Sequence, residues 1–328
     1  MKHTTLWLAL TLAVGAVAAE PGLSDLPGRS LVMVVGAAGE EEYGREFTRQ
    51  ARQWEEACQR AEVRLISIGT DEGDGQLDAD RLKQVLAEEP RAGGEALWVV
   101  LVGHGTFDGK EARFNTRGPD FSATDLAAWL KPFERPLVVI NTASASAPFL
   151  VGLKSTNRVV IAATRSGAEQ NLTRFGGFLA DAIAAPDADL DRDGQTSLLE
   201  AFLSAAARVA EFYKSAGRLA TEHALIDDNG DGLGTPADWF RGVRATRKAA
   251  DGASLDGIRA HQMPLVRGAD EERLPASVRE RRDALEQAVF QLRETKDQWD
   301  EDTYYAKLEK LLLDLARLTP AVGSDLYY

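Results

Sequence analysis

The chain has 328 residues, and its 38 Lys and Arg against 51 Asp and Glu give a formal net charge of −13. Hydrophobic residues make up 44% and charged residues 27%, values typical of a folded globular protein. The excess of carboxylates argues against nucleic acid or an anionic membrane as a partner, because binding either requires clustered Lys and Arg. A chain of this length can bury a full hydrophobic core.

The cysteine and histidine content limits how this protein is stabilised. A single cysteine, Cys58, excludes an intramolecular disulfide. Four histidines scattered over positions 3, 104, 223 and 261 leave little for a zinc cluster.

Residues 1–19 have the pattern of a signal peptide. Lys2 and His3 precede an apolar run over residues 6–17, and the small residues 16–19 offer a cleavage site near Glu20. The run is too short to span a bilayer, and no other segment is long enough. No cysteine lies at the cleavage site itself, which argues against a lipoprotein. We expect an exported protein, periplasmic or secreted, without a membrane span.

From residue 31 onward, strand-like and helix-like patterns alternate. Apolar runs predict strands over residues 31–35, 63–68, 97–102, 137–140 and 159–162, and amphipathic patterns predict helices over 41–60, 80–88, 123–130, 174–184 and 198–216. Continuous β-branched runs suit strands buried on both faces, as in a parallel sheet. Asp108-Gly109 predicts a small hairpin after the third strand.

Two loops at strand ends carry the candidate chemistry. The third strand runs into Gly103-His104-Gly105, and the fourth runs into the segment Asn141 to Ser146. Ligands and catalytic groups gather at the carboxyl ends of strands in open α/β sheets. Glycines on both sides present the imidazole of His104, and Gly105 lets a backbone N–H approach a reacting oxygen.

This ordered set resembles the caspase-like cysteine peptidases, the clan of legumain, gingipains and caspases. The likeness rests on the strand ending at His104-Gly105, on the strand that continues into residues 141–146, and on residues 159–170, which look like a substrate-pocket strand and loop. It covers roughly residues 28–250. The resemblance implies that His104 is the histidine of the catalytic dyad and that the Gly105 N–H belongs to the oxyanion hole. At the position of the cysteine it puts Ala143.

Alanine has no nucleophile, and Cys58 falls within the first predicted helix, where packing is the simpler role. We therefore favour a noncatalytic pseudopeptidase that binds a peptide or protein. The alternative is an active hydrolase with His104 as base and Ser144 or Ser146 as nucleophile, although this segment lacks the glycines of a nucleophile elbow. A third hypothesis is a calcium-stabilised scaffold. His104 alternatively caps its strand end, and Arg165 and Glu169 line a pocket or lie in a solvated loop.

The strongest single motif is an EF-hand-like calcium loop over residues 189–200. It matches the pattern D-x-D-x-D-G-x5-E at every fixed position, with Gly194 at the sharp bend. We expect Ca²⁺ to be bound by Asp189, Asp191, Asp193, the carbonyl of Gln195 and Glu200.

A second acidic loop spans residues 227–238, with Asp227, Asn229, Asp231 and Asp238 as candidate calcium ligands. It departs from the pattern because it ends in aspartate. Thr235, Pro236 and Asp238 also have the pattern of a helix N-terminus that needs no metal. Both interpretations stay open for this loop. His223, beside Glu222, is expected to form a local hydrogen bond.

The C-terminal part is predicted to be a linker over residues 251–273 and a helical hairpin over 274–320. Val278, Leu285, Leu292 and Trp299 repeat every seven residues, and a second apolar stripe runs along residues 304–318. The hairpin docks on the body or mediates association, and we favour docking. The predicted fold class is α/β: a caspase-like parallel sheet flanked by helices, with EF-hand-like loops and a C-terminal helical hairpin.

Overall fold

The computed structural model describes residues 28–70 and 75–318, so the expected signal peptide lies outside the described residues. Its centre is a seven-stranded sheet in the order β10-β9-β8-β7-β3-β1-β2. The bounds are β1 (Ser30–Val35), β2 (Arg64–Ile68), β3 (Leu97–Val102), β7 (Leu137–Asn141), β8 (Arg158–Ala162), β9 (Leu225–Asp227) and β10 (Thr235–Pro236). The first five in the chain pair in parallel, and β9 and β10 pair antiparallel. The predicted parallel sheet is confirmed.

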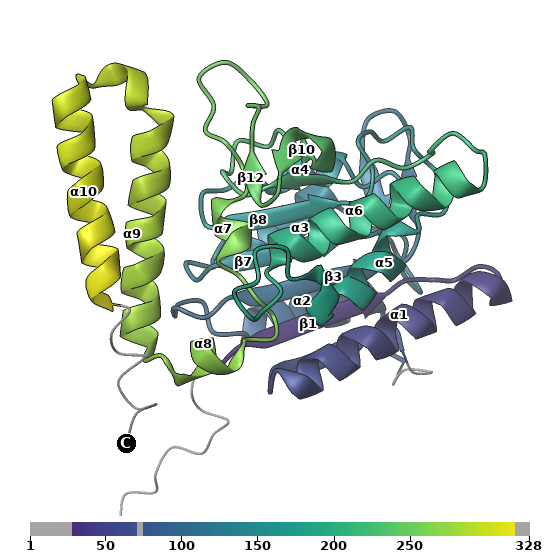
Figure 1. Ribbon diagram of the computed structural model, residues 1–328. Coiled ribbons are helices and arrows are strands. Elements are labelled where there is room, and N and C mark those ends of the chain that lie inside the picture. Colours follow the sequence, from purple (N-terminus) through teal and green to yellow (C-terminus); the bar gives the residue numbers. More distant parts are fainter. Residues whose placement is uncertain (1–27, 71–74, 319–328) are drawn as a thin grey trace, which may run out of the picture.

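Helices cover both faces of this sheet (Figure 1). One face packs against α1 (Glu41–Arg60), α5 (Phe175–Ala182) and α6 (Leu198–Ser215), and the other against α2 (Asp78–Glu88), α3 (Ala123–Leu130) and α4 (Pro148–Leu153). Successive residues of β1 alternate between the two cores, with Leu31 and Met33 in the first and Val32 and Val34 in the second. Burial on both faces is therefore the reason for the continuous apolar runs in the sequence.

A small second sheet follows β3. It consists of β4 (Gly105–Phe107), β5 (Ala112–Phe114) and β6 (Phe121–Ser122), paired antiparallel. The predicted turn at Asp108-Gly109 is confirmed, because Asp108 Oδ1 accepts the N–H groups of Lys110 and Glu111. The Phe114 ring packs on Gly103, where an added Cβ would lie 2.9 Å from the ring. This contact fixes the chain just before His104.

The segment expected to be a linker, residues 251–273, is packed on the body. It contains α7 (Ile258–His261) and α8 (Ala269–Arg273), and it buries Ala260 and Leu265 completely or nearly so. The Asp228 carboxylate accepts the N–H groups of Gly257, Arg259 and Ala260. Polar side chains in and around this segment form hydrogen bonds with backbone groups. A polar composition is therefore compatible with a packed segment. It follows the short elements η2 (Ala237–Trp239), β11 (Phe240–Arg241) and β12 (Arg244–Ala245).

The chain then forms an antiparallel helical hairpin of α9 (Ala276–Glu294) and α10 (Glu301–Leu318), yellow in Figure 1. Leu285 and Leu292 of the predicted stripe are buried, while Trp299 is 41% exposed. Asp300 Oδ1 accepts the Thr303 N–H at 2.9 Å and so caps α10. Among the described helices, none has the length and apolar character needed to cross a membrane.

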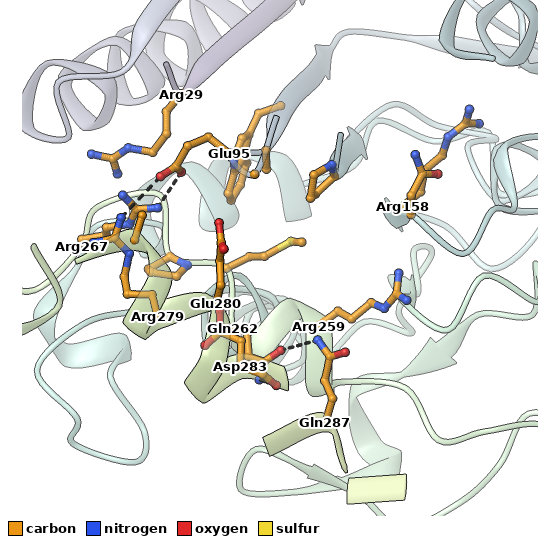
Figure 2. A pocket seen from close by; sticks show the side chains of 18 of the residues that line it. Arg29, Glu95, Arg158, Arg259, Gln262, Arg267, Arg279, Glu280, Asp283 and Gln287 are labelled. Atoms are coloured by element: carbon orange, nitrogen blue, oxygen red, sulfur yellow. Dashed lines mark hydrogen bonds and ion pairs between the residues drawn. The ribbon is translucent and has the colours of Figure 1, made fainter. Parts of the chain in front are cut away.

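The hairpin docks on the body through α9 and polar contacts. A cavity of about 520 Å³ lies between α9 and the amino ends of β3 and β8 (Figure 2). At its edge the Glu95 carboxylate pairs with Arg267 at 2.6 Å and with Arg279 at 3.5 Å. The Gln262 amide donates to the Asp283 carbonyl at 3.0 Å. These contacts support the docked arrangement of the tail.

Candidate functional site

The two predicted loops meet at the carboxyl edge of the sheet. β3 and β7 are parallel neighbours, with Leu101 opposite Asn141, so the loops that follow them lie side by side. The Gly105 N–H donates to Ser144 Oγ at 3.2 Å, and the Ser144 hydroxyl donates to the Gly105 carbonyl at 3.0 Å. The sequence argument placed these residues together, and the structure agrees.

Both Ser144 and Ala143 lie against Gly105: the Ser144 hydroxyl exchanges hydrogen bonds with its backbone, and the Ala143 Cβ would lie 3.4 Å from a Cβ added to Gly105. The Ala143 methyl group is fully buried in the core on the α2, α3 and α4 side, and its N–H donates to Asn141 Oδ1 at 3.0 Å. The Ser144 side chain is buried as well, within the turn of residues 143–145. The resemblance puts Ala143 at the nucleophile position, and the structure places the Ser144 hydroxyl beside it, next to Gly105.

Two backbone features fix this arrangement. A Cβ atom on Gly105 would lie 2.3 Å from the Ser144 carbonyl oxygen, so only glycine fits there. Ala145 has a φ of 53°, a left-handed conformation that is unfavourable for alanine. Its N–H donates to the Glu169 carbonyl at 2.8 Å, which holds the strained turn in place.

His104 is held by the loop after β1 and by α1. Its Nε2 lies 3.3 Å from the Ala38 carbonyl, and its ring meets the edges of Tyr43 and Phe47 with centroids 4.9 and 5.0 Å away. A carbonyl only accepts, so Nε2 carries the proton and Nδ1 is the bare nitrogen of the neutral ring. Burial lowers the pKa of His104, and the Ala38 carbonyl opposes that shift. Within the described residues, no hydrogen bond joins His104 to Ser144.

Ser146, the other candidate nucleophile, has a structural role. Its Oγ lies 3.2 Å from Thr164 Oγ1 and accepts the Thr164 N–H at 3.2 Å. The Ala147 N–H donates to the same threonine oxygen at 3.1 Å. Both Ser146 and Thr164 are buried. This pair fastens the loop after β7 to the end of β8.

Glu169 connects the loop after β7 to the start of β9. Its carboxylate lies 2.6 Å from His223 Nδ1, accepts the His223 N–H at 3.2 Å and pairs with Arg165 at 3.3 Å. Because 54 positions separate Glu169 from His223, no local pattern in the sequence could reveal this contact. His223 therefore bonds across the fold, where a local partner was expected.

The first acidic loop gathers its carboxylates as expected. Asp189, Asp191 and Asp193 offer oxygen atoms that lie within 4.8 Å of one another. Gly194 adopts a φ of 92°, the sharp bend the pattern requires. Asp189 accepts the N–H groups of Arg192 at 2.6 Å and Gly194 at 3.0 Å. Burial, followed by the nearby Glu200 and Asp193 carboxylates, raises the pKa of Asp191.

The last residue of the loop, Glu200, braces it. Its Oε1 accepts the Leu190 N–H at 2.8 Å and the Asp191 N–H at 3.2 Å, and its Oε2 accepts the Ser197 N–H at 2.9 Å. Gln195 uses its side chain on Asp193 and on the Gly268 N–H. Glu200 is thus aimed at the loop, and Gln195 Oε1 ties the loop to the start of α8.

The second acidic loop has a similar course. Asp227 accepts the N–H groups of Gly230 and Gly232 at 2.8 Å each, and Asn229 Oδ1 accepts the Asp231 N–H at 2.8 Å. Burial raises the pKa of Asp227 to about 6. Asp231 Oδ2 is buried and has no hydrogen-bond partner among the described residues.

Asp238, the last residue of this loop, is placed differently from Glu200 in the first loop. It lies exposed in η2, after Pro236, so the helix N-terminus that the sequence suggested forms as a single 3₁₀ turn. Asp228 and Asp256 close the loop from the other side: the Asp228 N–H donates to Asp256 Oδ1 at 2.9 Å.

Comparison with known proteins shows a distant likeness to solved structures. No family model matches the sequence, and no curated protein sequence matches it. The chain is similar to the Drosophila initiator caspase Dronc (15% identity, TM-score 0.40, covering 61% of this chain and 79% of that one) and to caspase-1 from Spodoptera frugiperda (8%, 0.39, 62% and 86%). It is also similar to a secreted C11 cysteine protease from Bacteroides thetaiotaomicron (14%, 0.34, 61% and 66%). Likenesses this distant carry no conclusion about activity.

Proposed function

We propose that this chain is an exported, noncatalytic relative of the caspase-like cysteine peptidases that binds a peptide or protein segment at the carboxyl edge of its sheet. The closed pair of Gly105 and Ser144 is the observation that carries the proposal. The N–H that the resemblance assigns to an oxyanion hole already has a partner. The Ser144 proton goes to a carbonyl, and a serine nucleophile needs a base to receive it.

The same edge supports binding. Ligands of open α/β sheets bind outside the carboxyl ends of the strands. The His104 ring is fixed by Ala38, Tyr43 and Phe47, and its bare Nδ1 is an acceptor for a donor such as a peptide N–H. A fixed acceptor costs little ordering entropy when the ligand arrives.

A peptide-library experiment with the full chain tests this proposal. We expect some peptides to bind without being cleaved, with and without Ca²⁺, and we expect equal labelling of wild type and Ser144→Ala by a fluorophosphonate hydroxyl probe. Cleavage that disappears in His104→Ala would establish the rival hydrolase instead.

We also propose that Ca²⁺ binds the loop of residues 189–200. Three carboxylates within 4.8 Å of one another repel unless a cation or protons separate them, and carboxylate oxygens are the ligands that Ca²⁺ prefers. In the second loop, the buried Asp231 Oδ2 without a partner supports a second ion, because a buried charged oxygen is costly when unpaired. Equilibrium dialysis tests this: two ions per chain are expected, and one after Asp231→Asn.

The exported location is proposed from residues 1–19 alone. Expression of the full chain in a bacterial host, followed by mass spectrometry of the N-terminus, tests it. We expect a product that begins near Glu20 outside the cytoplasm, whereas an uncleaved chain in the cytoplasm would contradict the proposal.

A further inference from the structure

A second, apolar cavity lies beside α6. It has a volume of about 480 Å³, and its lining is mainly apolar, with Phe175, Leu190, Leu203, Pro236 and Phe240 as its larger members. Ala207 and Ala210, both exposed on α6, form part of its wall. Pockets of this size and composition are typical of sites that receive a large apolar group.

The cavity lies at the same edge of the sheet as the candidate peptide site. β9 runs antiparallel to β8, so Leu225 at its start lies opposite Ala162 at the end of β8. Pro236, the last residue of β10, lies opposite Leu225. The residues just before β9 and just after β10, which line the cavity, are therefore brought to the carboxyl ends of the parallel strands.

Glu169 is the bridge between the two sites. Its carbonyl accepts the Ala145 N–H next to Ser144, and its carboxylate contacts His223, which lines the cavity. One residue thus separates the turn that carries Ser144 from the cavity wall.

The charges around the cavity select the type of side chain. The Glu222 carboxylate in the wall is buried, and it accepts the N–H groups of Arg174 and Phe175 and the Tyr213 hydroxyl. Asp238 also lines the cavity, and Glu169 lies next to His223. The carboxylates of Glu222 and Asp238, both in the lining, repel an acidic group, while the apolar wall favours a leucine or an aromatic ring.

We propose that this cavity receives a large apolar, non-acidic side chain of a peptide bound at the carboxyl edge. This inference rests on the proposed peptide-binding function and adds the chemical class of the segment that binds. Because Leu190 lies between Asp189 and Asp191, one wall of the cavity also belongs to the candidate calcium loop.

The test uses the full chain and pools of acetylated, amidated hexapeptides in which one position in turn is Leu, Phe, Ala or Glu and the others are mixed. At one position, Leu and Phe pools should bind wild type about tenfold more tightly than Ala and Glu pools, as expected for an apolar side chain in a fitted pocket. Ala207→Trp fills the cavity, and Ala210→Glu places a carboxylate in its wall. Both variants should lose the preference while still binding the Ala pool.

Lys214→Trp is the control, because it places the same tryptophan side chain on α6 at an exposed position outside the lining, and it should keep the preference. Binding without any preference, or a preference that survives in both cavity variants, overturns this inference and leaves peptide binding intact. If no pool binds wild type, the proposed function fails as well. Equal affinity for free N-acetylphenylalanine amide and the Phe pool would make the cavity a small-molecule site and overturn the peptide as its occupant. Thermal unfolding checks each variant, and Ala210→Glu decides if Ala207→Trp does not fold.

Discussion

The hydroxyl of Ser144 and the backbone of Gly105 satisfy one another, with the N–H of Gly105 donating at 3.2 Å and the hydroxyl donating back to the carbonyl at 3.0 Å. This exchange ties the loop after β7 to the start of β4. It also uses the two groups that an acyl-transfer site would need free, namely a nucleophile and an oxyanion donor. Neither group is therefore free to act on the carbonyl of a peptide bound at this edge.

The first prediction concerns this pair. Ser144→Ala removes both hydrogen bonds and leaves the Gly105 groups without that partner, which should lower the free energy of unfolding by about 1 kcal/mol. Urea unfolding measures the loss. Ser166→Ala, on the exposed loop after β8, is the matched control and should change little. Equal stability of both variants would show that the Ser144 exchange contributes nothing.

The second prediction concerns calcium. Ca²⁺ should raise the melting temperature, since an ion that binds only the folded state stabilises it by mass action. Asp191→Asn with Asp193→Asn should abolish most of the rise, because two of the three converging carboxylates lose their charge. Asp187→Asn, an exposed aspartate in the 3₁₀ turn η1 (Pro186–Ala188), should preserve it. A melting curve that a chelator leaves unchanged would refute calcium binding.

The third prediction concerns the titration of His104. Burial lowers the pKa of His104 below its usual 6.5, so the folded state binds fewer protons than the unfolded state at slightly acidic pH. The stability contributed by the neutral ring is present above pH 6.5 and is lost as the pH falls through the folded-state pKa. Proton NMR of the imidazole C2–H should give a midpoint below 6.5, with His104→Phe assigning the signal. A midpoint at or above 6.5 would contradict the burial argument.

The sheet was predictable because burial on both faces requires continuous apolar runs, which are easily recognised in the sequence. Each of the five parallel strands lies within one residue of its predicted bounds, as in the run over residues 97–102. The direction of Ser144 was not predictable, since a left-handed Ala145 and an inward Ala143 depend on contacts with Glu169 and the core. Contacts across the fold, such as Glu169 with His223, leave no periodic pattern.

The segment 251–273 is a second case in which the sequence did not predict contacts across the fold. Its polar composition suggested a linker, yet Asp256 accepts the N–H groups of Asp228 and Asn229 and the Thr235 hydroxyl. Composition records that residues are polar and says nothing of whether their partners are water or backbone.

The last prediction concerns this buried pair of aspartates. Burial, followed by the charge of the neighbouring Asp228, raises the pKa of Asp256 to about 8. The folded state therefore holds a proton that the unfolded chain, with a pKa near 3.8, has already released. Stability from this group is present below the unfolded-state pKa and is lost as the pH rises from about 4 to about 8, which is the reverse of ordinary acid denaturation.

Asp256→Asn keeps an acceptor oxygen for the two N–H groups and cannot ionise, so it imitates the protonated acid. The experiment is done in the presence of a chelator, which removes any contribution from Ca²⁺. Urea unfolding should then give similar stabilities for the variant and wild type at pH 5. At pH 8 the variant should be the more stable of the two. The comparison cancels the other titrating groups, because they are common to both proteins. If the difference in stability between wild type and the variant stays constant from pH 5 to pH 8, then Asp256 is ionised in the folded state throughout this range and the burial argument is wrong.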